Sequence, residues 1–252
     1  MSRGNQDSHL IGGIHAVRSA LKHGKGQVLQ LWLDLTRKDN RIGELEEIAH
    51  QAGIGVTRAR KQQLDDMLND VRHQGAVASV RAPSAKTEKD LYSSLEQLDE
   101  PIFLLVLDGV TDPHNLGACL RSADAAGVQA VIAPKDRSAG LTPVTCKVAS
   151  GAAETVMSVQ VTNLVRALEK LKNDYGVWVI GTAGEAEASL DQADLKGNLA
   201  IVMGAEGKGM RRLTRETCDS LIKLPMKGSV ESLNVSVASG ICLYEAVRQR
   251  EV

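Results

Sequence analysis

The sequence predicts an α/β protein whose larger part is a mainly parallel sheet with helices on both faces. From residue 102 onward, short apolar runs alternate with stretches of helical periodicity. Roughly 80 residues before this part show the same alternation on a smaller scale, which indicates a second, smaller α/β unit. The chain has 252 residues and 43% hydrophobic content, enough to bury one large core or two smaller ones.

The smaller unit is expected to span residues 8–82. Its pattern predicts helices over 14–21, 42–51 and 64–68, and strands over 28–33, 55–57 and 76–80. The segment that follows, residues 83–100, is polar and charged and lies between Pro83 and Pro101. Because it has little to bury, we interpret it as a linker that carries a short helix.

The larger unit is expected to span residues 101–252. Strands are predicted over 102–107, 128–133, 155–161, 177–182, 199–204 and 221–224, and helices over 116–126, from about 144, over 164–172, from about 211 and over 235–250. Ligands of such sheets collect at the carboxyl ends of the strands. The loops that follow the strands are therefore expected to carry the function.

Composition excludes several classes of protein. The longest apolar runs, residues 101–107 and 199–203, fall far short of the roughly 20 residues that span a bilayer, so no membrane association is expected. The polar N-terminus lacks the apolar core of a secretion signal, which favours the cytoplasm. Cys119, Cys146, Cys218 and Cys242 form no CxxC pair, so we expect reduced thiols and no metal site.

Charge is distributed unevenly along the chain. The net charge is −1, but residues 1–85 hold 12 Lys and Arg against 9 Asp and Glu, whereas residues 86–252 hold 18 against 22. Five of the six histidines also lie in the first segment. This asymmetry permits nucleic-acid binding without demonstrating it. The candidate cationic contacts are Arg18, Lys22, Arg58, Arg60, Lys61, Lys208, Arg211 and Arg212.

Three loops that follow apolar strands are dense in Gly, Asn, Ser and charge. In the first, residues 107–127, Asn115 is placed to cap a helix that begins at Leu116, and Arg121 follows six residues later. In the second, residues 201–212, three glycines bracket Glu206, in an order that matches neither a P-loop nor a dinucleotide fingerprint.

The third loop, residues 224–240, opens the last predicted helix, which Ser232 or Asn234 could cap. It contains no GxSxG elbow of a hydrolase. Taken one at a time, each of the three loops is explained by turns, helix caps and surface charge.

Taken in order, the loops read DPHNxGAxxRxxxxxG, then GxExxG, then PMxGxxxSLNVSxA. This set resembles the three signature motifs of the SpoU/TrmH family, within the SPOUT class of RNA 2'-O-methyltransferases, and the resemblance covers residues 101–252. In the first segment, IGGIHAVRSAL and HQGAVASV look like the substrate-binding domain of a subset of this family. The arrangement is most similar to bacterial members that methylate a guanosine ribose in the peptidyl-transferase P loop of 23S rRNA.

The resemblance implies a homodimer, a deep trefoil knot in the second unit, and S-adenosylmethionine bound in the knot as methyl donor without a metal. The sparse aromatic residues, 2% of the chain, favour recognition of RNA through shape, phosphate and 2'-hydroxyl contacts. The positions that correspond to the donor pocket are Thr182, Met203, Gly204, Gly207, Leu224, Met226, Ser232 and Leu233.

Arg121 matches the essential arginine of the family, which implies either a base assisted by an RNA phosphate or a stabiliser of the developing alkoxide or phosphate. The resemblance further implies that Asn115, Glu206, Ser232 and Asn234 hold Arg121 and orient the ribose. Glu231 departs from the small polar residue expected beside the pocket, which puts the local charge in doubt.

Three other functions are weighed against this one. A family member that acts on tRNA ribose is disfavoured by the attached first unit. A non-catalytic RNA-binding knot protein is disfavoured because all five catalytic positions are present. A nucleotide-dependent oxidoreductase is disfavoured by the GxxGxG order of the second loop.

Overall fold

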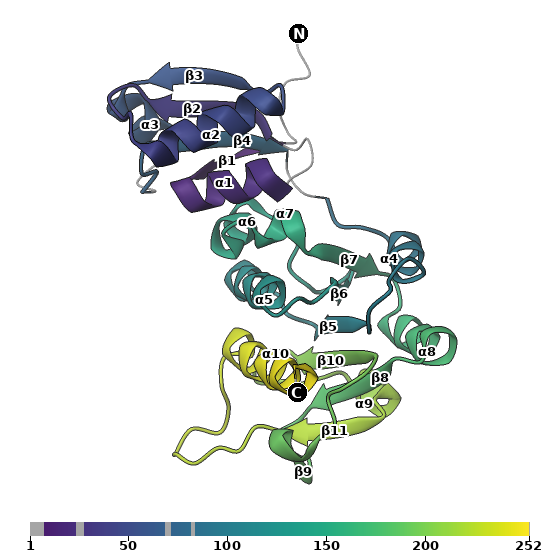
Figure 1. Ribbon diagram of the computed structural model, residues 1–252. Coiled ribbons are helices and arrows are strands. Elements are labelled where there is room, and N and C mark those ends of the chain that lie inside the picture. Colours follow the sequence, from purple (N-terminus) through teal and green to yellow (C-terminus); the bar gives the residue numbers. More distant parts are fainter. Residues whose placement is uncertain (1–7, 24–27, 69–71, 82–83, 252) are drawn as a thin grey trace. The chain divides into compact units, whose positions relative to one another are not determined.

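The structure is a computed structural model that describes residues 8–23, 28–68, 72–81 and 84–251 (Figure 1). It divides into two compact units, Met1–Pro83 and Ser84–Val252. None of the helices in the described ranges is long and apolar enough to cross a membrane.

The first unit contains a four-stranded mixed sheet in the order β1-β4-β2-β3. β4 pairs antiparallel with β1 and β2, and β3 pairs parallel with β2. Its core includes Val17, Leu31 and Leu45, all fully buried. The strands are β1 (Ser8–Gly12), β2 (Val28–Asp34), β3 (Gly55–Ala59) and β4 (Ala76–Arg81), and the helices are α1 (Ile14–His23), α2 (Asn40–Gln51) and α3 (Lys61–Leu68).

The sequence pattern missed β1, because this strand has only one buried residue, Ile11, and therefore lacks the apolar run of the interior strands. Its backbone pairs with one neighbour only, β4, at the edge of the sheet. An edge strand of this kind owes its conformation to ladder hydrogen bonds more than to its own composition.

The second unit contains a seven-stranded sheet in the order β7-β6-β5-β10-β8-β11-β9, in which every neighbouring pair is parallel. β5, β6 and β7 extend to one side, and β10, β8 and β11 to the other. The direction of strand order changes between β5 and β10, where such sheets leave a crevice at the carboxyl ends. The strands are β5 (Phe103–Asp108), β6 (Ala130–Pro134), β7 (Met157–Val161), β8 (Trp178–Thr182), β9 (Ala188–Ser189), β10 (Leu199–Gly204) and β11 (Ser220–Lys223).

Helices cover both faces of this sheet, which confirms the predicted fold class (Figure 1). Along β5 the side chains alternate: Leu105 and Leu107 pack with α5 and α10, and Leu104 and Val106 pack with α4 and α8. The helices are α4 (Glu88–Leu95), α5 (Pro113–Ala125), α6 (Pro143–Ala149), α7 (Ala152–Thr155), α8 (Leu164–Tyr175), α9 (Arg212–Thr217) and α10 (Val235–Arg250), with a short 3-10 turn at Leu190–Gln192.

Residues 84–100 contain the expected short helix, α4, but they belong to the second unit rather than to a linker between the units. Lys86 forms a parallel bridge with Val159 of β7, and α4 buries Leu91 and Leu95 in the core of the second unit. Thr87 caps α4 through a capping box with Asp90. The polar composition concealed this role because two buried leucines are enough to hold a two-turn helix against the sheet.

Candidate active site

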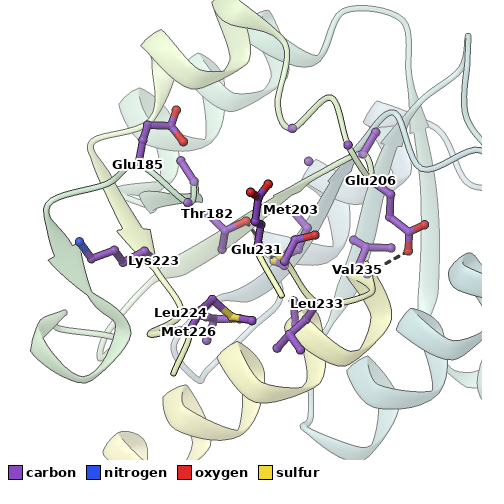
Figure 2. A pocket seen from close by; sticks show the side chains of 18 of the residues that line it. Thr182, Glu185, Met203, Glu206, Lys223, Leu224, Met226, Glu231, Leu233 and Val235 are labelled. Atoms are coloured by element: carbon purple, nitrogen blue, oxygen red, sulfur yellow. Dashed lines mark hydrogen bonds between the residues drawn. The ribbon is translucent and has the colours of Figure 1, made fainter. Parts of the chain in front are cut away.

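A cavity of about 510 Å³ opens at the carboxyl ends of β8, β10 and β11 (Figure 2). Strand, loop and helix residues line it: the end of β8, the loop after β10, the segment after β11 and the start of α10. The structure brings all eight positions of the expected donor pocket to this one cavity: Thr182, Met203, Gly204, Gly207, Leu224, Met226, Ser232 and Leu233.

The loop after β10 folds back tightly on itself. Ala205 and Gly209 exchange two backbone hydrogen bonds, of 3.1 and 2.8 Å. A Cβ atom on Gly204 would lie 2.3 Å from the backbone of Gly209 and Met210, so only glycine allows this approach. The turn places Gly204, Ala205, Glu206, Gly207 and Gly209 along the cavity wall.

Apolar, acidic and basic side chains share the rest of the cavity wall, and Lys223 is the basic one. Figure 2 shows Met203, Leu224 and Leu233 together with the carboxylates Glu185 and Glu231 around the opening. Glu185 pairs with Arg215, whereas Glu231 is exposed. Glu231, the departure from the family pattern, therefore contributes a negative charge to the rim of this cavity, which favours a cationic ligand.

Glu206 joins the three motif loops. Its Oε1 atom accepts hydrogen bonds from Asn115 Nδ2 at 3.2 Å, Asn234 Nδ2 at 2.6 Å and the backbone N–H of Val235 at 3.2 Å. Asn234 Nδ2 also donates to Asn115 Oδ1, at 2.9 Å. Three of the five predicted catalytic residues thus form one polar cluster, although they are up to 119 residues apart in the chain.

Asn115 does not cap α5, contrary to prediction. α5 begins at Pro113, and Asp112 is its N-cap, accepting a hydrogen bond from the backbone N–H of His114. Proline at the first helical position moved the helix start three residues earlier than the apolar pattern suggested. Asn115 therefore lies inside the helix, free to bond Glu206. Asn234 does cap α10, through Ser236 N–H, which confirms that alternative.

Arg121 and Ser232 lie apart from the polar cluster. Ser232 is exposed and lines the cavity. Arg121 is exposed on α5, and no hydrogen bond or ion pair between described residues joins it to Asn115, Glu206, Ser232 or Asn234. The expectation that these residues hold Arg121 is thus not met within one chain. Six residues separate Arg121 from Asn115, which turns their side chains about 120° apart around the helix.

A second cavity, of about 540 Å³, lies at the carboxyl ends of β5, β6 and β10. It shares Ala205, Glu206, Gly209 and Val235 with the first cavity. Asp108, which the sequence reasoning overlooked, ends β5 here. Its side chain is fully buried and accepts hydrogen bonds from Arg211 Nε at 2.6 Å and Arg211 N–H at 2.8 Å. A charged residue that ends an apolar strand was the available signal.

Several of the cationic side chains predicted to contact RNA form ion pairs with carboxylates of the protein. Arg18 and Lys22 both pair with Glu44, and Arg58 pairs with Glu46. In the second unit, Arg212 pairs with Glu216 and Arg211 with Asp108. The remaining candidates, Arg60, Lys61 and Lys208, are exposed and form no ion pair within the described residues.

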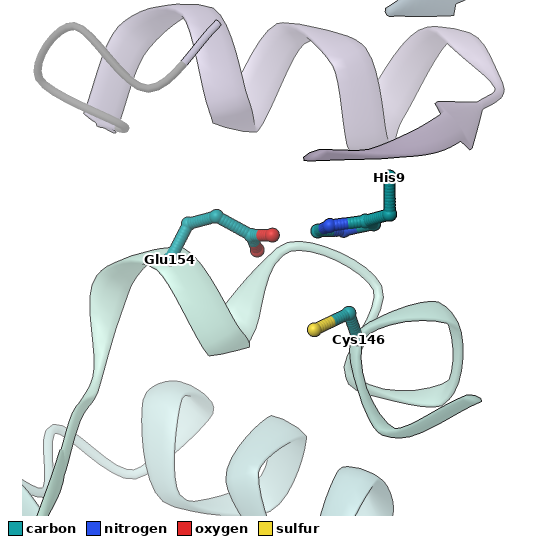
Figure 3. Close-up of side chains that lie close together, drawn as sticks. All are labelled: His9, Cys146 and Glu154. Atoms are coloured by element: carbon teal, nitrogen blue, oxygen red, sulfur yellow. The ribbon is translucent and has the colours of Figure 1, made fainter. Parts of the chain in front are cut away.

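The cysteines are free thiols, as predicted. Burial raises the pKa of Cys119 to about 11 and that of Cys242 to about 12, so both remain neutral near pH 7 and neither is an activated nucleophile. Cys146 on α6 and Glu154 on α7 lie within 4.8 Å of each other (Figure 3).

Two family models match the chain. The SpoU rRNA Methylase family model matches residues 102–244, and the model for RNA 2'-O ribose methyltransferase substrate binding matches residues 10–85. The first match lies within the second unit, and the second match covers most of the first unit and ends two residues beyond it.

Curated relatives match nearly the whole chain. The 23S rRNA (guanosine-2'-O-)-methyltransferase RlmB of Shewanella oneidensis is 58% identical over 241 residues, which cover 96% of this chain and 97% of the relative. The protein of the same name from Pseudomonas putida is 57% identical over 240 residues, with 95% and 96% coverage.

Solved structures show the same fold. A crystal structure of an RNA 2'-O ribose methyltransferase has a TM-score of 0.76 and 26% identity, covering 98% of this chain and 90% of the other. The SpoU methyltransferase AviRb from Streptomyces viridochromogenes, crystallised with AdoMet, has a TM-score of 0.75 and 23% identity, with 98% and 94% coverage.

Proposed function

The chain belongs to the SpoU rRNA methylase family, and we propose that it transfers a methyl group from S-adenosylmethionine to the ribose 2'-hydroxyl of a guanosine in 23S rRNA. The observation that carries this proposal is the identity of 57–58% to the two named relatives, which extends through both units. We place the target in the peptidyl-transferase P loop and the reaction in the cytoplasm, where bacterial ribosomes are assembled.

The first cavity suits the methyl donor. Its volume of about 510 Å³ lies within the usual range for small-molecule sites. S-adenosylmethionine, when bound, supplies a methyl group on a positively charged sulfur. The backbone of the loop at Gly204 and the side chains of Leu224 and Met226 would hold its flat and apolar parts, and the acidic rim would favour its cationic parts.

The polar cluster suits an acceptor ribose. A 2'-hydroxyl is a weak nucleophile until its proton is removed, so the site must position it and stabilise the developing oxyanion. Glu206 fixes the two amides of Asn115 and Asn234 in one orientation. We assign this cluster and Ser232 to orienting the ribose, and Arg121 to the oxyanion or the adjacent phosphate.

We propose that the active form is a homodimer. Arg121 lines neither cavity of its own chain, so a second chain must bring it to the acceptor site. One face of α10 exposes Val237, Ile241 and Tyr244, at spacings of four and three residues, and these apolar side chains form a stripe that a second copy can bury.

The first unit and the knot complete the proposal. We assign the first unit to RNA binding, on the strength of the substrate-binding family model, with Arg60 and Lys61 as its available cations. We propose that the chain forms the trefoil knot of its family between β10 and α10. The convergence of the segments after β8, β10 and β11 on one cavity supports this proposal.

Methyl transfer provides the test. Purified protein is incubated with labelled S-adenosylmethionine and either undermethylated 23S rRNA or tRNA, and the ribose methyl is mapped. We expect a single 2'-O-methylguanosine in 23S rRNA. A methyl group on tRNA would support the tRNA alternative, and donor binding without transfer to either RNA would support a non-catalytic protein.

Replacement of Arg121 tests its role and the dimer together. Arg121→Ala is expected to lower kcat by at least about a hundredfold while donor affinity stays near that of the unchanged protein. Mixing Arg121→Ala chains with chains defective in donor binding should restore part of the activity. Absence of restoration in mixtures shown to contain mixed dimers would assign Arg121 to its own chain.

A further inference from the structure

The second cavity differs from the first in its charged lining. Arg137, Lys208 and Arg211 line it, together with the carboxylates Asp108, Asp112 and Glu206. Each carboxylate already accepts hydrogen bonds from the protein: Asp108 from Arg211, Asp112 from His114 N–H, and Glu206 from the amides described above. Each carboxylate thus has hydrogen-bond donors within the protein, and the charge of Asp108 is also paired with that of Arg211.

Two of the three cationic side chains of this cavity have no carboxylate partner among the described residues. Arg137 and Lys208 are exposed and form no ion pair with any described residue. Arg211 is half exposed, at 51%, while its partner Asp108 is at 0%. Asp108 holds Nε and Nη2 of the guanidinium, and Nη1 is bound by no described residue. The buried Asp108 carboxylate thus fixes the Arg211 guanidinium and leaves its Nη1 group available to a ligand in the cavity.

The backbone at Arg137 supports a built site. Arg137 has a φ of 58°, in the left-handed region that residues with a side chain rarely adopt. Such a conformation persists where the surrounding structure imposes it, frequently at binding sites. Here the residue in this conformation is an arginine that lines the cavity and forms no ion pair with any described residue.

We propose that the second cavity is the acceptor-nucleotide subsite, an inference that rests on the proposed function. In this subsite Arg137, Lys208 and Arg211 bind the RNA phosphodiester next to the target ribose, and Asp108 orients Arg211. The two cavities share Ala205, Glu206, Gly209 and Val235. A ribose beside Glu206 therefore faces the donor cavity on one side, and its phosphate reaches the three cations on the other.

Equilibrium binding of undermethylated 23S rRNA at several salt concentrations tests the subsite without relying on turnover. Arg211→Gln, Arg137→Gln and Lys208→Gln should each weaken RNA binding by about tenfold, and reduce the slope of log affinity against log salt by about one. Affinity for S-adenosylmethionine should not change. Arg166→Gln on α8, which removes an exposed arginine that lines neither cavity, is the matched control and should leave both affinities unchanged.

Asp108→Asn tests whether the buried carboxylate acts through Arg211. We expect it to weaken RNA binding as Arg211→Gln does, and the double variant to be no weaker than either single one, because the two residues act as a unit. Thermal unfolding of each variant separates this effect from loss of the fold. The proposal is overturned if the three glutamine variants keep the salt slope and RNA affinity of the unchanged protein.

Failure of the proposed function would look different. In that case the unchanged protein would not methylate 23S rRNA, whatever the three cations contribute to binding. Methylation by the unchanged protein, combined with unaltered RNA binding by the variants, would refute the subsite alone.

Discussion

The two cavities that share Glu206 differ in the kinds of residue that line them. Glycines of the loop after β10 and apolar side chains such as Leu224 and Met226 line much of the first cavity, where four of 19 lining residues are charged, whereas six of the 13 residues that line the second cavity are charged. The shape of a cavity lined by backbone groups depends on the conformation of the chain. The charge of a cavity lined by ionised side chains depends on the residue at each position. The first cavity should therefore be sensitive to backbone changes and the second to charge changes.

The largest expected effect on donor affinity comes from a methyl group added at Gly204, in the backbone that lines the first cavity. In Gly204→Ala, the added Cβ meets the backbone of Gly209 and Met210, which cannot move without opening the turn. We expect affinity for S-adenosylmethionine, measured by calorimetry, to fall by on the order of a hundredfold. Gly140→Ala is the control, because a Cβ there meets nothing within 4 Å. Equal loss in both variants would contradict the assignment.

A second expected effect concerns the residue shared by both cavities. Glu206→Ala leaves the amides of Asn115 and Asn234 without their common acceptor, and we expect kcat to fall by about tenfold to a hundredfold. Glu206→Gln keeps an oxygen at the Oε1 position and should retain most of the activity. If the glutamine variant is as slow as the alanine variant, the negative charge itself is required rather than the orientation of the amides.

The smallest expected effect on donor affinity comes from changing an apolar side chain that lines the first cavity. Met226→Leu conserves volume, so donor affinity should change by less than about tenfold. Calorimetric titration with S-adenosylmethionine measures it against Gly204→Ala. A loss as large as that of Gly204→Ala would show that side-chain shape, rather than backbone conformation, controls the first cavity.

Sequence reasoning worked best where a pattern is local. The strand at β10 and the helix at α10 were predicted with their observed bounds, because an uninterrupted apolar run and a capped helix start are both visible in neighbouring residues. It missed β1, where long-range pairing decides the structure, and it predicted a short helix at α4 without its place in the core, which two buried leucines decide.

The sequence by itself determined the fold class and the order of the three motif loops, because both rest on residue type and spacing. The resemblance to the family, rather than spacing, indicated the residues that line the first cavity. Only the tertiary structure decided that Asn115 bonds Glu206 instead of capping its helix, that Arg121 lines neither of the two cavities, and that Asp108 holds Arg211. These are contacts between residues 91 or more positions apart, or directions around a helix axis. Spacing along the chain carries no information about them until the strands are assembled into a sheet.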